Sequence, residues 1–247
     1  MALLIEDDPK RRGLRPDGEC LPGSPTVGPN PAGVTIHEAI RSKAFRNLYA
    51  ACLICSFGVF VPFVHLTPYA LDRGIGPMAA SVLLGLIGAG STAGRLVLGG
   101  LADRMGRAYF LLAMYIGMAL AMAVWAVAAS FIPLIAFALV FGLFYGGWVT
   151  ILPSVVMDRF GGAHVSGIIG ALYTAVAFGT LIGPTAAGYI FDVTQSYLLP
   201  IVLSVIANVL AAVITARALP RSSGRGESRP SRKACAPAAP RSGCAAG

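Results

Sequence analysis

The chain has 247 residues, of which 56% are hydrophobic and only 12% are charged, and its formal net charge is +8. A soluble domain usually carries about twice that charged fraction, so lipid rather than water is expected to surround most of this chain. The basic residues lie in loops and tails, where they indicate membrane topology and attraction to anionic lipid rather than a nucleic-acid partner.

The first 44 residues are predicted to form a cytoplasmic loop that is largely irregular. The stretch 18–33 is rich in turn-forming residues and shows no hydrophobic periodicity. A short amphipathic helix is expected after it, because Thr35 stands three residues before Glu38, which is the spacing of a capping box. This helix would lead the chain into the apolar region 45–219.

Residues 45–219 are predicted to fold as a bundle of six transmembrane helices. Each apolar block is close to or longer than the ~20 residues that cross ~30 Å of hydrocarbon, and none shows the alternation of a barrel strand. Because every backbone amide in lipid must be paired within its own segment, such blocks must be helical. The expected spans are Asn47–Thr67, Ala79–Leu101, Ala108–Ala129, Pro133–Val156, Val165–Ile190 and Leu198–Ala218.

The distribution of Lys and Arg predicts that both termini are cytoplasmic. One set of connections carries Arg104, Arg107 and Arg159, together with the basic N-terminal segment and C-terminal tail. The opposite set carries only Arg73. Residues 220–247, rich in Ser, Gly, Pro, Ala and Arg, are predicted to be a disordered cytoplasmic tail. The expected location is therefore a cell membrane, in a multi-pass arrangement.

The connection between the second and third spans carries the most specific motif. Residues 99–107 read Gly-Gly-Leu-Ala-Asp-Arg-Met-Gly-Arg, which resembles the G-x-L-A-D-R-x-G-R loop of the major facilitator superfamily. Gly99 is expected to let two helices approach closely, and Gly106 to allow a tight turn with positive φ. Together with Asp103, Arg104 and Arg107, these glycines are expected to form a cytoplasmic latch that breaks and remakes between conformations.

The resemblance extends over about residues 5–218 and implies a fold. Residues 9–19 are similar to the cytoplasmic loop that joins the two six-helix halves of such transporters. Residues 56–69, 142–148 and 179–192 are similar to the seventh, tenth and eleventh helices of bacterial monocarboxylate-transporter-like members. The resemblance implies an all-α membrane protein that forms the C-terminal half of a twelve-helix fold in a bacterial inner membrane. Its partner would be an N-terminal six-helix half or a second copy.

Arg95 is the only formal charge well inside a predicted span. Such a charge costs several kcal/mol against lipid unless it faces a wet cavity, so it indicates a functional site. The resemblance implies that this arginine binds the substrate carboxylate, to which a guanidinium offers two parallel hydrogen bonds. The alternative is that Arg95 snorkels to the cytoplasmic headgroups, because it lies only about two turns from Asp103. The acid that the family carries four residues earlier is Ser91 here, which puts proton coupling through that position in doubt.

Four more side chains complete the candidate site. Together with Ser91, the aromatic residues Tyr145, Trp148 and Tyr173 are candidate substrate contacts, because tyrosine and tryptophan combine an apolar face with a polar tip. Packing is the alternative for the three aromatic residues. His65, near the outer end of the first span, is a candidate proton relay because imidazole titrates near neutral pH. The alternative is an ordinary hydrogen-bonded side chain.

Prolines and glycines within the spans carry two further expectations. Pro62, Pro153 and Pro184 are expected to break their helices locally, as transporters do near their sites. The glycines of the fifth span are expected to allow close helix approach. Cys52 and Cys55 form a C-x-x-C inside an apolar block and are interpreted as packing residues, so no metal site or cofactor is expected.

Three classes of function remain to be compared. An enzyme is not expected. Ser166 and His164 do not stand in the G-x-S-x-G motif of a serine nucleophile, and the sequence has no H-E-x-x-H motif or phosphate-binding loop. A secondary active transporter half, moving a small organic anion such as a monocarboxylate by alternating access, is the preferred hypothesis. The alternative is a truncated non-transporting fragment or an accessory membrane subunit.

Overall fold

The computed structural model describes residues 34–162 and 164–218. Within these ranges the regular elements are all helices, as the sequence predicts. The predicted loop before residue 34 and the predicted tail 220–247 lie outside the described residues. The helices are α1 (Ile36–Arg41), α2 (Lys43–Val59), α3 (Val61–Asp72), α4 (Pro77–Met105), α5 (Arg107–Val127), α6 (Phe131–Phe160), α7 (Val165–Thr194) and α8 (Leu198–Ala218).

Six membrane spans are formed by these helices, since α2 and α3 together make the first span, Lys43–Asp72. Each span is long and apolar enough to cross a membrane. The predicted sixth span, Leu198–Ala218, is confirmed at both ends. The first, second, fourth and fifth spans run several residues past their predicted ends, because the helix continues through polar residues into the interfacial region.

A break divides the first span where α2 meets α3. Phe60 separates the two helices, and Pro62 lies in the first turn of α3, where its missing N–H costs nothing. The expected break at Pro62 is therefore confirmed. The expectation was wrong for Pro153 and Pro184, which lie inside the continuous helices α6 and α7. Each proline removes a single backbone hydrogen bond, and packing on neighbouring helices keeps such helices continuous in a membrane.

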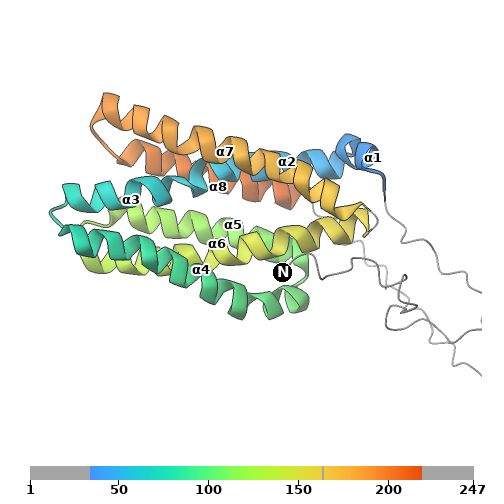
Figure 1. The fold of residues 1–247 in the computed structure, drawn as a ribbon, viewed down its shortest axis with the longest axis horizontal. Coiled ribbons are helices and arrows are strands. Elements are labelled where there is room, and N and C mark those ends of the chain that lie inside the picture. Colours follow the sequence, from blue (N-terminus) through green and yellow to red (C-terminus); the bar gives the residue numbers. More distant parts are fainter. Residues whose placement is uncertain (1–33, 163, 219–247) are drawn as a thin grey trace, which may run out of the picture.

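The helices form two layers of three, and Figure 1 shows α2, α7 and α8 above α4, α5 and α6. In the first layer α2 packs against both α7 and α8, and in the second α6 packs against both α4 and α5. Contacts of α5 with α8 and of α3 with α4 join the two layers. The helices α4 and α7 are the least buried spans, so each leaves a broad face uncovered.

The bundle carries its largest aromatic side chains inside and aliphatic side chains outside. Trp125 and Tyr115 are fully buried, whereas Leu96 of α4 is 79% exposed and Leu181 of α7 is 70% exposed. Contiguous apolar surface of this kind is rare on soluble monomers. Lipid is the solvent that such a surface fits, and the chain is therefore a multi-pass membrane protein.

The connections between spans lie at two opposite ends of the bundle (Figure 1). At one end, Gly106 with φ 86° and Gly161 with φ 76° connect α4 to α5 and α6 to α7. The predicted positive φ of Gly106 is thus confirmed. At the other end, Gln195 adopts a left-handed conformation with φ 53°, and its side-chain amide donates a 3.0 Å hydrogen bond to the carbonyl oxygen of Asp192. That bond satisfies a carbonyl that the end of α7 leaves unpaired.

The short helix α1 lies against α2 and the beginning of α7. The predicted capping box is confirmed, because the Thr35 N–H donates to the Glu38 carboxylate at 3.1 Å and the Glu38 N–H donates to the Thr35 hydroxyl at 3.4 Å. The Thr35 side chain and backbone, in that order, hold the pKa of Glu38 below its usual value. The Val34 N–H donates to the carbonyl oxygen of Phe160 at 3.1 Å, which ties the chain just before α1 to the end of α6.

Candidate functional site

The candidate site is built on the crossing of α4 and α6, where each helix carries two glycines four residues apart. Gly90 and Gly94 of α4 meet the backbone of α6, and Gly142 and Gly146 of α6 meet the backbone of α4. A Cβ atom on Gly90 would lie 2.5 Å from the carbonyl oxygen of Leu139. The two backbones are therefore in direct contact, in the small-x3-small packing typical of membrane helices.

This crossing places Arg95 at the level of the part of α6 that carries Tyr145. Arg95 is an exposed residue of α4, about 15 Å along the helix axis from Met105 at 1.5 Å per residue. Arg95 follows Gly94, whose backbone meets that of Leu143, two residues before Tyr145 in α6, and Tyr173 is 37% exposed on α7. In the described part of the chain, no carboxylate forms an ion pair with Arg95.

The other two predicted substrate contacts lie behind this group. Ser91 is 6% exposed in the contact between α4 and α6, and Trp148 is 2% exposed with its ring centroid 6.0 Å from that of Tyr145. Neither the Ser91 hydroxyl nor the Trp148 indole N–H has a hydrogen-bond partner among the described residues. In this conformation Trp148 supports Tyr145, and Ser91 lies in the contact that brings α4 against α6.

Two aromatic residues beside Tyr145 were not among the predicted site residues. Phe60, at the break in the first span, and Phe63, in the first turn of α3, are partly buried, and their ring centroids lie 6.2 and 5.2 Å from that of Tyr145. Their spacing of three residues around Pro62 is visible in the sequence. Their contact with Tyr145 depends on how α3 packs against α6, and no local sequence pattern predicts that packing.

His65 lies on α3 and reaches across to α7. Its Nε2 atom is 3.0 Å from the carbonyl oxygen of Pro184, and its ring lies 3.6 Å from the position of a Cβ on Gly188. Its ring centroid is also 6.0 Å from that of Tyr197. His65 thus links the outer parts of two spans, and its role as a proton relay stays a prediction.

The predicted latch residues lie at the turn between α4 and α5. The guanidinium of Arg107 forms an ion pair with Asp158 at the end of α6 and lies 3.7 Å from the carboxylate of Asp103. Arg104 is exposed in the last turn of α4. The expectation of close helix approach at Gly99 was wrong, because a Cβ there would have nothing within 4 Å. The close contacts of α4 lie five and nine residues earlier, at Gly94 and Gly90, since α6 crosses α4 there.

The expectation for the glycines of the fifth span is confirmed at two positions. A Cβ atom on Gly179 would lie 2.9 Å from the backbone carbonyl carbon of Ser56, and one on Gly183 would lie 2.9 Å from the Cα of Phe57. These contacts press α7 onto α2 just before the break at Phe60. Close approach here replaces the side-chain contacts that larger residues would make.

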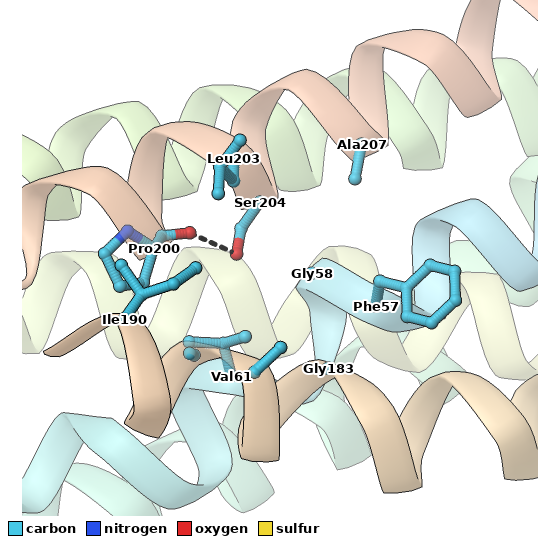
Figure 2. A pocket seen from close by; sticks show the side chains of 11 residues that line it. Phe57, Gly58, Val61, Gly183, Ile190, Pro200, Leu203, Ser204 and Ala207 are labelled. Carbon is cyan, nitrogen blue, oxygen red and sulfur yellow. Dashed lines mark hydrogen bonds between the residues drawn. The ribbon is translucent and has the colours of Figure 1, made fainter. Parts of the chain in front are cut away.

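A separate pocket of about 150 Å³ lies between α2, α3, α7 and α8. Figure 2 shows that its polar group, the Ser204 hydroxyl, donates to the carbonyl oxygen of Pro200, at 2.8 Å. The remaining labelled side chains, such as Ile190 and Leu203, are apolar. Among the described residues that line it there is no charged group, so this pocket lacks the chemistry to bind an anion.

The C-x-x-C pair of α2 is buried in the core. Cys52 and Cys55 are both 0% exposed and not joined by a disulfide. The Cys55 thiol donates to the Asn208 side-chain oxygen at 3.4 Å, and the Cys52 thiol lies 3.8 Å from the Tyr115 hydroxyl. No cluster of metal-ligating side chains occurs within residues 34–162 and 164–218. These contacts agree with the interpretation of both cysteines as packing residues.

A family model described as the Major Facilitator Superfamily matches residues 3–243, nearly the whole chain. The chain belongs to the Major Facilitator Superfamily. Its six spans correspond to half of the twelve-helix fold of this family, and its relatives are membrane transporters.

Several of these relatives are named monocarboxylate transporters. Monocarboxylate transporter 12-B of Danio rerio is 30% identical over 170 residues, which cover 66% of this chain and 35% of that protein. Monocarboxylate transporter 11 of Homo sapiens is 28% identical over 213 residues, 81% of this chain and 45% of that protein. The MFS transporter asaE of Aspergillus flavus is 28% identical over 169 residues, 68% of this chain and 38% of that protein. The chain spans less than half the length of these relatives.

Proposed function

We propose that this chain is the C-terminal half of a secondary active transporter that moves a small organic anion, such as a monocarboxylate, by alternating access. The observation that carries the proposal is Arg95, an exposed residue inside a membrane span that pairs with no carboxylate among the described residues. In a transporter of this family, two six-helix bundles rock against each other around a site near the midplane.

The chemistry of this face favours an anion with a carboxylate. A guanidinium presents a planar fork that matches two carboxylate oxygens, and a phenol O–H donates a hydrogen bond. No carboxylate in the described ranges neutralises Arg95, so a bound anion would supply the missing negative charge. The names of the monocarboxylate transporters among the relatives support the same substrate class.

The partner and the orientation belong to the same proposal. The uncovered faces of α4 and α7 would pack against an N-terminal six-helix half or a second copy of this chain. The end of the bundle that carries Gly106 and Gly161 would face the cytoplasm, because the basic residues Arg104, Arg107 and Arg159 lie there. Both termini would then be cytoplasmic, in the inner membrane of a bacterium.

Uptake of a labelled monocarboxylate tests the proposal. The chain would be produced together with an N-terminal six-helix half of a monocarboxylate transporter relative, and uptake of labelled lactate and pyruvate measured. Arg95→Ala should raise the KM about tenfold or more, because a charged hydrogen bond contributes about 1.5–3 kcal/mol. Arg95→Lys should recover part of the affinity, and Arg217→Ala, far along α8, should have no effect. Unchanged uptake and affinity in Arg95→Ala would show that Arg95 does not bind the substrate.

A further inference from the structure

Aromatic rings form a stack along one side of α6. Phe137, Phe141 and Tyr145 follow one another at intervals of four residues, with ring centroids 5.4 and 6.3 Å apart and interplanar angles of 27° and 11°. Trp125 of α5 adds a fourth ring, stacked 5.2 Å from Phe137. Phe137, Phe141 and Trp125 are fully buried, whereas Tyr145 is only partly buried. The stack therefore reaches the surface of the bundle at Tyr145.

Two further rings surround this end of the stack. Phe60 meets Tyr145 at an interplanar angle of 81°, and Phe63 meets it at 62°, so both contacts are edge-to-face. Phe60 and Phe63 are themselves partly buried. Arg95 lies at the same level, because the neighbouring Gly94 meets the backbone of Leu143, two residues before Tyr145. One face of the bundle thus combines a guanidinium with three aromatic rings that still have uncovered surface.

We propose that this face selects organic anions that carry an aromatic ring, with the carboxylate at Arg95 and the ring against Tyr145, Phe60 and Phe63. This inference rests on the proposed function and narrows its substrate class to aryl carboxylates. Aromatic rings prefer offset-stacked or edge-to-face neighbours, and such pairs gain free energy beyond their buried area. An aryl ligand would extend the existing stack by one ring, whereas lactate or pyruvate would leave the three rings uncovered.

A pair of matched ligands separates ring electronics from hydrophobicity. 3-Phenylpropanoate and 3-cyclohexylpropanoate share the carboxylate and the chain length, and the cyclohexyl compound is the more hydrophobic of the two. Each would compete with labelled 3-phenylpropanoate for the chain assembled with the N-terminal six-helix half in lipid nanodiscs. Aromatic contacts predict that the phenyl compound binds about three- to tenfold more tightly. Equal affinity, or tighter binding of the cyclohexyl compound, would overturn the inference.

Substitutions of the aromatic residues test whether the preference for the phenyl compound arises at this face. Tyr145→Leu and Phe63→Leu should abolish the preference for the phenyl compound, while Tyr145→Phe should keep it because the ring remains. Phe144→Leu is the matched control, since Phe144 lies beside Tyr145 but packs against α5 at Gly117. Size-exclusion profiles identify any variant that fails to fold. A preference that survives Tyr145→Leu and Phe63→Leu in folded protein contradicts the inference.

The same assay distinguishes failure of the inference from failure of the proposed function. If both compounds bind equally and Arg95→Ala abolishes both, the anion site stands and the aromatic selection is wrong. If neither compound nor lactate binds, or if Arg95→Ala changes nothing, the proposed function fails and the inference fails with it.

Discussion

A guanidinium within a membrane span is expensive unless water, a counter-ion or hydrogen-bond acceptors surround it. Arg95 lies ten residues before Met105, the last residue of α4, and no carboxylate among the described residues pairs with it. A residue of this kind reduces the stability of the isolated bundle. We propose that it serves to bind an anion, so its effect on stability and its effect on function can be measured separately.

The first prediction concerns this trade between stability and function. Arg95→Leu should leave the thermal unfolding temperature of the detergent-solubilised chain unchanged or raise it, while uptake of organic anions is lost. Removing a charge without an ion-pair partner costs the fold nothing. Thermal unfolding and uptake measured on the same variant check this. A clear drop in unfolding temperature would show that Arg95 is structural.

A second prediction concerns the ion pair of Arg107 with Asp158. Both side chains are partly exposed, at 36% and 49%, so water screens their attraction. A double-mutant cycle with Arg107→Ala and Asp158→Asn should give a coupling free energy of about 1 kcal/mol or less, and high salt should reduce it. A coupling of several kcal/mol that ignores salt would mean that the pair is shielded in the assembled protein.

At the scale of elements, the glycines of α4 show what the sequence could and could not predict. The sequence contains every glycine, but only the crossing of α4 with α6 decides which ones are needed. Gly99 belongs to the family motif and was expected at a close contact, whereas Gly90 and Gly94 actually make it. Helix length and hydropathy predicted the spans well. Pairing between spans is a tertiary property, and no local pattern carries it.

The third prediction tests this crossing. Gly146→Ala should destabilise the bundle by about 1–3 kcal/mol, because its Cβ would overlap the backbone of Ser91. Gly88→Ala is the matched control on α4, where a Cβ would have nothing within 4 Å. That change should be neutral or stabilising by up to about 1 kcal/mol, since alanine favours a helix over glycine. Thermal unfolding of both variants tests this prediction. Equal changes in unfolding temperature for Gly146→Ala and Gly88→Ala would exclude the close crossing of α4 and α6.

The short helix α1 gives a fourth prediction, which concerns pH. Hydrogen bonds from Thr35 lower the pKa of Glu38 from its ordinary value of 4.5, so the carboxylate stabilises the helix cap at neutral pH. This contribution is complete above pH 4.5 and is lost as the pH falls through the lowered pKa. Amide exchange, corrected for intrinsic rates, should show that protection of residues 35–41 falls on acidification. Glu38→Gln should show no such loss, and an identical pH response in this variant would contradict the prediction.

For the whole molecule, the composition predicted a membrane protein, and the apolar blocks predicted its six spans. Both predictions succeed because lipid requires long, apolar, helical segments. The two-layer arrangement and the uncovered faces of α4 and α7 follow from packing, which the sequence did not reveal. The candidate site divides in the same way. A charge in a span identified Arg95 directly, whereas Phe60 and Phe63 became visible only when the break in the first span placed them against Tyr145.

Water access to position 95 tests most directly whether the Arg95 face belongs to a transport pathway. In a chain whose tail cysteines Cys20, Cys235 and Cys244 are changed to serine, Arg95→Cys would be compared with Leu96→Cys in the assembled transporter. Leu96 is 79% exposed on the apolar outside, and the two native cysteines of α2 are fully buried and should stay unreactive. A membrane-impermeant thiol reagent should modify position 95, and position 96 should not react. Modification of position 96 at the same rate, or no modification of position 95, would contradict the proposed site.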